Sequence, residues 1–187
     1  MTSDKSQSKR ELRSAIRRIL RAMEPGSGGD VRQAVAEWLE DHPELNVIGA
    51  YAAMAGEVDL VPLVVGFPGR RWLFPRVDGD DLVLHEVKDP ARDLVAGAFG
   101  IREPAASLPV LRADEVDVFL CPGLAFDGRG GRLGRGRGFY DRMLGGARPS
   151  ALRIGVCHPR QRVADTFPEP HDIPMHRVID GAGPPAR

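Results

Sequence analysis

The sequence feature that most constrains the fold is a strand, a glycine-rich loop and a helix in direct succession, at residues 121–144 (CPGLAFDGRGGRLGRGRGFYDRML). Glycines let the backbone take positive φ angles and approach a ligand closely, and six of them lie between residues 128 and 138: Gly128, Gly130, Gly131, Gly134, Gly136 and Gly138. Arginines supply planar, forked donors for phosphate or carboxylate oxygens, and the same segment holds Arg129, Arg132, Arg135 and Arg137. The segment therefore predicts a binding site for an anion.

A short helix is expected at residues 139–144, directly after Gly138. Its N-terminal amides and dipole also favour an anion. Asp141 lies one turn into this helix, where it can hold a cation against that anion, so the pattern is typical of a polyphosphate with a metal. A flexible, solvated loop is the alternative. Apolar residues on both sides of the loop, which a disordered Arg/Gly tail would lack, favour a loop that is held in place.

Composition narrows the class of protein. The chain has 187 residues, of which 42% are apolar, enough for one α/β domain and short for two. Basic and acidic residues balance at 26 each, so the arginine-rich loop is a local feature and not part of a surface built for nucleic acid. Cys121 and Cys157 lie in apolar runs and read as buried, reduced thiols. We find no signal peptide and no membrane span in the sequence, and expect a cytoplasmic protein.

Hydrophobic periodicity predicts an amphipathic helix from Ser8 to about Met23. Lys9, Arg13 and Arg17 are four residues apart and so lie on one side of it. A second helix is expected after residue 30, with Asp30 as its N-cap. Residues 1–7 and 181–187 are expected to fray.

Short apolar runs bounded by Gly, Pro and Asp predict strands, separated by helical or loop segments. Their expected bounds are 47–51, 71–74, 82–87, 116–121, 153–157 and 177–179. This alternation favours a single α/β domain over residues 1–187, with a central, mostly parallel sheet flanked by helices. Ligands gather at the carboxyl ends of such strands, where two segments fall: residues 52–59 and the loop at 122–138.

In the glycine-rich loop and in several shorter motifs, the sequence resembles the 5-formyltetrahydrofolate cyclo-ligases, also called methenyltetrahydrofolate synthetases. The resemblance covers most of the chain in order, and its most specific part is PGLAFD at 122–127 followed by RLGRGRGFYD at 132–141. The outer matches are KRELR at 9–13, the strand and acidic loop at 51–59 that ends in GEVD, FPR at 74–76, GIREP at 100–104 and EPHDIP at 169–174. The resemblance implies a sheet of the type found in sugar-phosphate isomerases and CoA transferases. It also implies an ATP- and Mg²⁺-dependent conversion of 5-formyltetrahydrofolate to 5,10-methenyltetrahydrofolate, with ADP and phosphate released.

The resemblance also implies the site residues. ATP would be bound by two segments, namely Lys9, Arg10, Glu11, Leu12 and Arg13, and Arg132, Leu133, Gly134, Arg135, Gly136, Arg137, Gly138, Phe139 and Tyr140. Arg135, Arg137 and Tyr140 would act in catalysis, and Ala52 and Glu57 would bind the folate. A carboxylate such as Glu57 can accept paired hydrogen bonds from an aminopyrimidine edge. Without the resemblance, Lys9 and Arg13 read as a solvated helix flank and Glu57 as a turn residue.

For the metal, the resemblance implies Asp141 and a second position at which this chain has His176 in place of the usual Asp. Imidazole is a poor ligand for Mg²⁺, so either Asp141 and the phosphates carry the metal alone, or an acid such as Asp172 substitutes. Tyr51 and Trp72 read as core or sheet-edge residues.

Three functions remain as hypotheses. The first is a monomeric cyclo-ligase that acts on small molecules, with no nucleic-acid or membrane partner. The second is a non-catalytic relative that binds ATP or folate. The third, an RNA-binding Arg/Gly protein, is disfavoured because the net charge is zero and the motif is confined to one loop.

Overall fold

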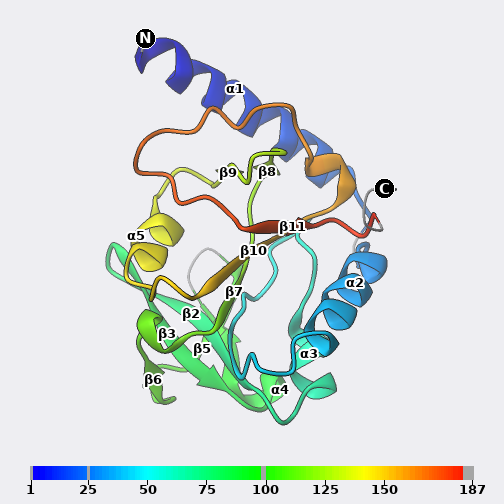
Figure 1. The fold of residues 1–187 in the computed structure, drawn as a ribbon, viewed down its shortest axis with the longest axis vertical. Coiled ribbons are helices and arrows are strands. Elements are labelled where there is room, and N and C mark those ends of the chain that lie inside the picture. Colours follow the sequence, from blue (N-terminus) through cyan, green and yellow to red (C-terminus); the bar gives the residue numbers. More distant parts are fainter. Residues whose placement is uncertain (1, 25, 98–99, 183–187) are drawn as a thin grey trace.

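The computed structural model describes residues 2–24, 26–97 and 100–182 (Figure 1). Its helices are α1 (Thr2–Arg21), α2 (Gly29–Glu40), α3 (Val61–Gly66), α4 (Pro90–Asp93) and α5 (Phe139–Gly145), with short 3-10 turns η2 (Ala113–Glu115) and η3 (Pro159–Gln161). The strands are β1 (Val47–Gly49), β2 (Arg71–Asp78), β3 (Asp81–Val87), β4 (Leu94–Ala96), β5 (Arg102–Pro104), β6 (Val110–Leu111), β7 (Val118–Cys121), β8 (Ala125–Phe126), β9 (Arg132–Leu133), β10 (Leu152–Val156) and β11 (Arg177–Ile179). Of the described helices, none combines the length and apolar character needed to cross a membrane.

The central sheet has the strand order β11-β10-β7-β1-β2-β3-β6. Strands β11, β10, β7, β1 and β2 run parallel, whereas β3 and β6 are antiparallel additions at one edge. The chain passes from β1 to β2 on one side, and β7 then pairs with β1 on its other side. A reversal of this kind leaves a crevice at the carboxyl ends of the two strands, where α/β proteins bind ligands. The expected single domain with a mostly parallel sheet is confirmed.

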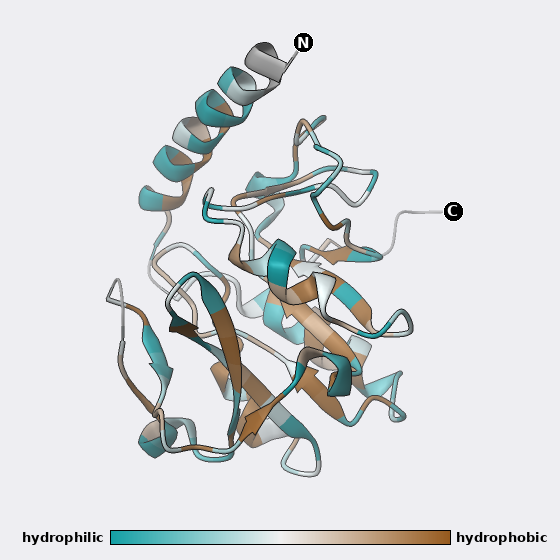
Figure 2. Cartoon of the chain, turned by 90° about the vertical axis from the view of Figure 1, so that its left-hand side faces the viewer, coloured by the Kyte–Doolittle hydropathy of each residue, from teal (hydrophilic) through white to brown (hydrophobic). Residues whose placement is uncertain are grey.

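Both faces of the sheet are covered, because alternate residues of each strand point to opposite faces. In β7, Val118 and Leu120 pack in the core cluster that includes α2 and α3, whereas Phe119 and Cys121 pack in the cluster that includes α5. Figure 1 shows α2 and α3 on one side of the sheet and α5 on the other. In Figure 2 the strands are mostly brown and the outer surface of α1 is mostly teal. The apolar strands thus form the middle layer between helices.

Helix α1 packs outside the sheet and its flanking helices, on the hairpin formed by β8 and β9. Ile16 and Leu20 on the helix are buried with Leu124, Ala125 and Leu133, and form a third core cluster. The N-terminal end of α1 projects from the body of the protein (Figures 1 and 2). This arrangement brings one face of α1 to the glycine-rich loop.

Several expected boundaries differ from the structure. Strand β1 ends at Gly49, two residues earlier than expected, and β2 extends to Asp78 because it pairs with β3 in a long hairpin. Helix α1 begins at Thr2 and ends at Arg21. The prediction of Asp30 as an N-cap is wrong: Gly28 occupies that position with a φ of 100°, and Asp30 lies in the first turn of α2. The loop at 122–138 contains the β8–β9 hairpin, which the sequence analysis missed.

Candidate active site

A cavity of about 890 Å³ opens at the carboxyl ends of β1 and β7. Its wall combines α1, the loop after β1, the β2–β3 hairpin, the glycine-rich loop, α5 and the segment before β11. The structure brings most of the predicted site residues into this wall: Lys9, Arg13, Ala52, Glu57, Arg132, Leu133, Gly134, Arg135, Gly136, Arg137, Gly138, Phe139, Tyr140 and Asp141. Residues far apart in the sequence therefore form one site.

Asp127 holds the start of the glycine-rich loop. Its buried carboxylate accepts hydrogen bonds from the backbone N–H groups of Arg129 (2.8 Å), Gly131 (3.0 Å) and Thr166 (3.1 Å), and from the Thr166 hydroxyl (2.7 Å). A side chain at Gly131 would collide with both Thr166 and Asp127. Burial alone would raise the pKa of Asp127, but these hydrogen bonds outweigh it and lower the pKa to about 2. The loop is therefore held in place at its start, as its apolar flanks predicted.

We expect Asp127→Asn to lower the free energy of unfolding by about 2 kcal/mol at pH 7, because a carboxyl whose pKa falls on folding stabilises the folded state while it is ionised. This stabilisation is complete above the unfolded value of 3.8 and is lost as the pH falls through that value toward about 2. Urea unfolding of both proteins at several pH values from 7 to 3 tests this. If the difference in unfolding free energy between the two proteins did not narrow at low pH, the lowered pKa would be wrongly assigned to Asp127.

One face of α1 carries three basic side chains at the predicted spacing, and two of them, Lys9 and Arg13, line the cavity. The Nε of Arg13 donates to the carbonyl of Gly134 at 3.0 Å, and the guanidinium of Arg17 donates to the carbonyl of Arg135 at 3.3 Å. Lys9 lies one turn before Arg13 and lines the same cavity. The interpretation of these residues as a solvated helix flank is therefore wrong for Lys9 and Arg13.

Lys9 is 5% exposed, and its ammonium lies between two carboxylates, Glu169 at 2.6 Å and Asp172 at 2.7 Å. Burial alone would lower the pKa of Lys9, but the hydrogen bonds to Asp172 and Glu169 outweigh it and raise the pKa. Glu169, His171 and Asp172 offer ligand atoms within 4.8 Å of one another. The pairing of Lys9 on α1 with Glu169 and Asp172 therefore gives the cavity both a fixed cation and carboxylate oxygens.

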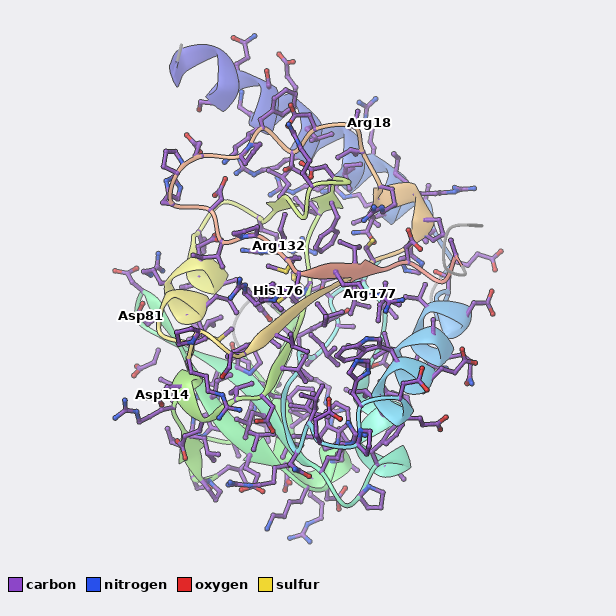
Figure 3. All side chains as sticks on the ribbon, in the orientation of Figure 1. Arg18, Asp81, Asp114, Arg132, His176 and Arg177 are labelled. Carbon is purple, nitrogen blue, oxygen red and sulfur yellow. The ribbon has the colours of Figure 1, made fainter. Side chains whose placement is uncertain are left out.

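Arg132 and Asp141 form a second ion pair in the wall. The Arg132 side chain is only 4% exposed and donates to Asp141 at 2.9 Å, and its guanidinium carbon lies 5.3 Å from the ring centre of Tyr140. The backbone N–H of Ile173 also donates to Asp141, at 3.3 Å. Because Ile173 follows Asp172, the two aspartates come from neighbouring parts of the wall. Figure 3 labels Arg132 between α1 and the central sheet.

Glu57 and Arg135 join the two predicted substrate sites. The guanidinium of Arg135 donates to Oε1 of Glu57 at 2.8 Å, and the backbone N–H of Met54 donates to Oε2 at 3.0 Å. The Glu57 side chain is 7% exposed, so this carboxylate is part of the cavity wall and not a solvated turn residue. A residue predicted to bind folate and a residue predicted to bind ATP are thus in direct contact.

Four predicted site residues lie outside the cavity wall. Arg10 and Glu11 are exposed on α1, and Leu12 packs on the cluster beneath that helix. His176 is exposed before β11 (Figure 3) and engages Arg153, whose backbone N–H donates to Nδ1 at 3.0 Å and whose guanidinium lies 2.9 Å from Nε2. The structure thus does not bring His176 together with Asp141.

Both cysteines are buried, and burial raises the pKa of each thiol to about 12. A thiol with such a pKa stays protonated at neutral pH and is a weak nucleophile. The reading of Cys121 and Cys157 as packed thiols agrees with this environment. Neither cysteine lines the cavity, so neither supplies a reactive thiol to it.

Sequence reasoning missed part of the wall. The apolar lining residues that it missed are Pro75, Val77, Leu82 and Ile101. It also missed Tyr51 as a wall residue, and Glu169 as a partner of Lys9. The FPR, GIREP and EPHDIP motifs contain or adjoin several of these residues, but the motifs alone do not tell which side chains face a cavity.

These features define a ligand-binding cavity at the carboxyl ends of a mostly parallel sheet. It is lined by arginines that suit phosphates and by apolar residues that suit a ring system. The sequence matches the model of the 5-formyltetrahydrofolate cyclo-ligase family over residues 5–181. The chain therefore belongs to the 5-formyltetrahydrofolate cyclo-ligase family.

Individual relatives agree with this assignment. The chain is 34% identical to the 5-formyltetrahydrofolate cyclo-ligase of Mycolicibacterium smegmatis, over 92% of this chain and 93% of the relative. It is 30% identical to that of Escherichia coli K12, over 88% and 95%. The solved structure of the Aquifex aeolicus 5,10-methenyltetrahydrofolate synthetase superposes with a TM-score of 0.80 at 30% identity, covering 94% of this chain and 90% of that one. A second synthetase, from Mycoplasma pneumoniae, shares the fold at 22% identity and a TM-score of 0.76.

Proposed function

We propose that this protein catalyses the ATP-dependent closure of 5-formyltetrahydrofolate to 5,10-methenyltetrahydrofolate, with release of ADP and phosphate. The observation that carries the proposal is the contact of Glu57 with Arg135 inside one cavity, because the reaction requires a folate and a phosphoryl donor to meet. The relatives named above are cyclo-ligases or methenyltetrahydrofolate synthetases, and this favours a catalytic protein over a non-catalytic relative.

The reaction explains why the cavity needs phosphate-binding groups. The formyl oxygen is an amide oxygen and a poor leaving group. Transfer of the γ-phosphoryl group of ATP to this oxygen releases ADP and activates the formyl carbon. The neighbouring folate nitrogen then forms a bond to that carbon and loses its proton, the carbon–oxygen bond breaks, and phosphate leaves. Phosphoryl transfer depends mainly on positioning and charge neutralisation, so no nucleophilic side chain is required.

We assign the residues of the cavity to these steps by their place in the wall. Arg135, Arg137 and Tyr140 lie in the glycine-rich loop and at the start of α5, and would contact the transferred phosphoryl group. Lys9, Arg13 and the backbone of residues 132–138 would bind the rest of the ATP polyphosphate. Glu57 and the backbone at Ala52 would hold the pterin end of the folate. Three residues of α1 lie outside the wall and would contribute to ATP binding only indirectly, namely Arg10, Glu11 and Leu12.

Mg²⁺ prefers carboxylate oxygens, and Asp141 and Asp172 offer such oxygens on adjoining parts of the wall. These donors fit the ion. Bound together with ATP, it would neutralise charge on the phosphates. His176 is a poorer candidate, since it is exposed and engaged by Arg153.

We further propose that the protein is cytoplasmic and monomeric, and that its partners are these two small molecules.

The test is to mix the protein with 5-formyltetrahydrofolate, ATP and Mg²⁺ and to follow the near-UV absorbance of the methenyl product. We expect absorbance to rise only when ATP and a divalent cation are both present. Conversion without ATP, or no conversion with any divalent cation, would contradict the proposed function.

A further inference from the structure

Tyr51 combines a ring that packs in the core with a buried hydroxyl. The residue follows β1 at the carboxyl end of the sheet, is 3% exposed and lines the cavity. Its ring packs with the core cluster of α2 and α3. Its oxygen is buried and has no hydrogen-bond partner among the described residues. The ring is thus explained by packing, but the hydroxyl is not.

An unpaired hydroxyl in this position is unfavourable for folding. Buried polar side chains nearly always have a hydrogen-bond partner. One without a partner has lost its hydration without gaining a hydrogen bond in exchange. Phenylalanine would fill the same space without that penalty. Because Tyr51 lines the cavity, a molecule bound there can supply the missing partner.

The surroundings of Tyr51 indicate which molecule this is. Tyr51 precedes Ala52, Met54 and Glu57, which line the cavity and include the two residues that the proposed function assigns to the folate, Ala52 and Glu57. Burial, and next the charge of Glu57, raise the pKa of Tyr51 well above 10.0. The hydroxyl is therefore protonated at neutral pH and can donate a hydrogen bond. A reduced pterin with a formyl group presents carbonyl oxygens that accept one.

We propose that the Tyr51 hydroxyl donates a hydrogen bond to a carbonyl oxygen of the reduced pterin and so helps to select the folate substrate. This inference rests on the proposed function and adds to it a binding residue on the core side of the cavity. It also explains why a polar atom is placed at the end of a buried strand.

The variant Tyr51→Phe removes only the hydroxyl. We expect the Kd for 5-formyltetrahydrofolate, titrated without ATP, to rise about fivefold to tenfold, which corresponds to the loss of one neutral hydrogen bond. The Kd for Mg-ATP should stay within about twofold. The thermal midpoint of the ligand-free protein should stay the same or rise, because an unpaired buried group has been removed. The affinity for a 5-formyltetrahydropterin that lacks the aminobenzoyl-glutamate tail should fall by the same factor from the wild type to Tyr51→Phe.

Arg129→Ala is the control, since Arg129 belongs to the glycine-rich loop but does not line the cavity. Its folate Kd should stay within about twofold. An unchanged folate Kd in Tyr51→Phe, an equal loss in both variants, or a loss seen only with the full-length folate would each overturn the inference. Failure of the proposed function looks different, because the wild-type protein would then neither bind 5-formyltetrahydrofolate nor convert it.

Discussion

Replacement of Arg135 by alanine is expected to lower kcat by about two orders of magnitude or more, because a guanidinium placed against a transferring phosphoryl group typically has an effect of this size. Arg135 is partly exposed, and among the described residues its side chain pairs with Glu57. An ion pair of this kind adds little to stability, so the thermal midpoint should change by only a few degrees. Steady-state kinetics with ATP as the varied substrate measure the effect.

Two further variants make this result specific. Arg135→Lys keeps the charge but loses the planar fork, and should retain more activity than alanine. Arg129 belongs to the same loop but pairs with Asp165 at 2.8 Å and does not line the cavity, so Arg129→Ala should keep kcat within about twofold. If Arg135→Ala and Arg137→Ala each left both kcat and the KM for ATP unchanged, the loop would be a solvated surface and not a phosphate site.

Asp141→Asn is expected to raise the Mg²⁺ concentration for half-maximal activity by about tenfold or more, since a neutral amide replaces a carboxylate at the position assigned to the metal. Folate binding, titrated without ATP, should change far less. Asp141 also pairs with the buried Arg132, so the thermal midpoint has to be measured alongside to separate loss of metal binding from loss of fold.

His176→Ala is the control for the metal site. The ring of His176 contacts Arg153 and lies outside the cavity wall, so its Mg²⁺ and Mn²⁺ titrations should match those of the wild type. His176→Asp should match them as well. If Asp141→Asn left the Mg²⁺ curve unchanged while His176→Ala shifted it, the metal would have to be assigned to the neighbourhood of His176.

The local parts of the site could be predicted from the sequence. Helical spacing placed Lys9 and Arg13 on one face, and the structure confirms that this face meets the glycine-rich loop. Gly138 was expected to precede a helix, and it is the N-cap of α5 with a φ of 68°. Each of these predictions depends on residues a few positions apart, for which backbone geometry alone sets the direction of a side chain.

The long-range parts could not be predicted from spacing. Lys9 meets Glu169 and Asp172 across about 160 positions of sequence, and a pattern of single residues does not encode such a pairing. The β8–β9 hairpin has strands of two residues each, too short to show any alternation. Tyr51 reads as a core residue because its ring packs in the core, and the sequence does not reveal that this residue also lines the cavity. His176 shows the same limit, since its place in a motif carries no information on the direction of its ring.

If one cavity couples the consumption of ATP to the closure of the folate ring, ADP and methenyl product must form together. The ratio of ADP to methenyl product in a single reaction mixture measures this coupling. We expect one ADP for each methenyl product, with neither formed when 5-formyltetrahydrofolate, ATP or the divalent cation is left out. Methenyl product formed without ADP, or ADP released at the same rate without the folate, would contradict it.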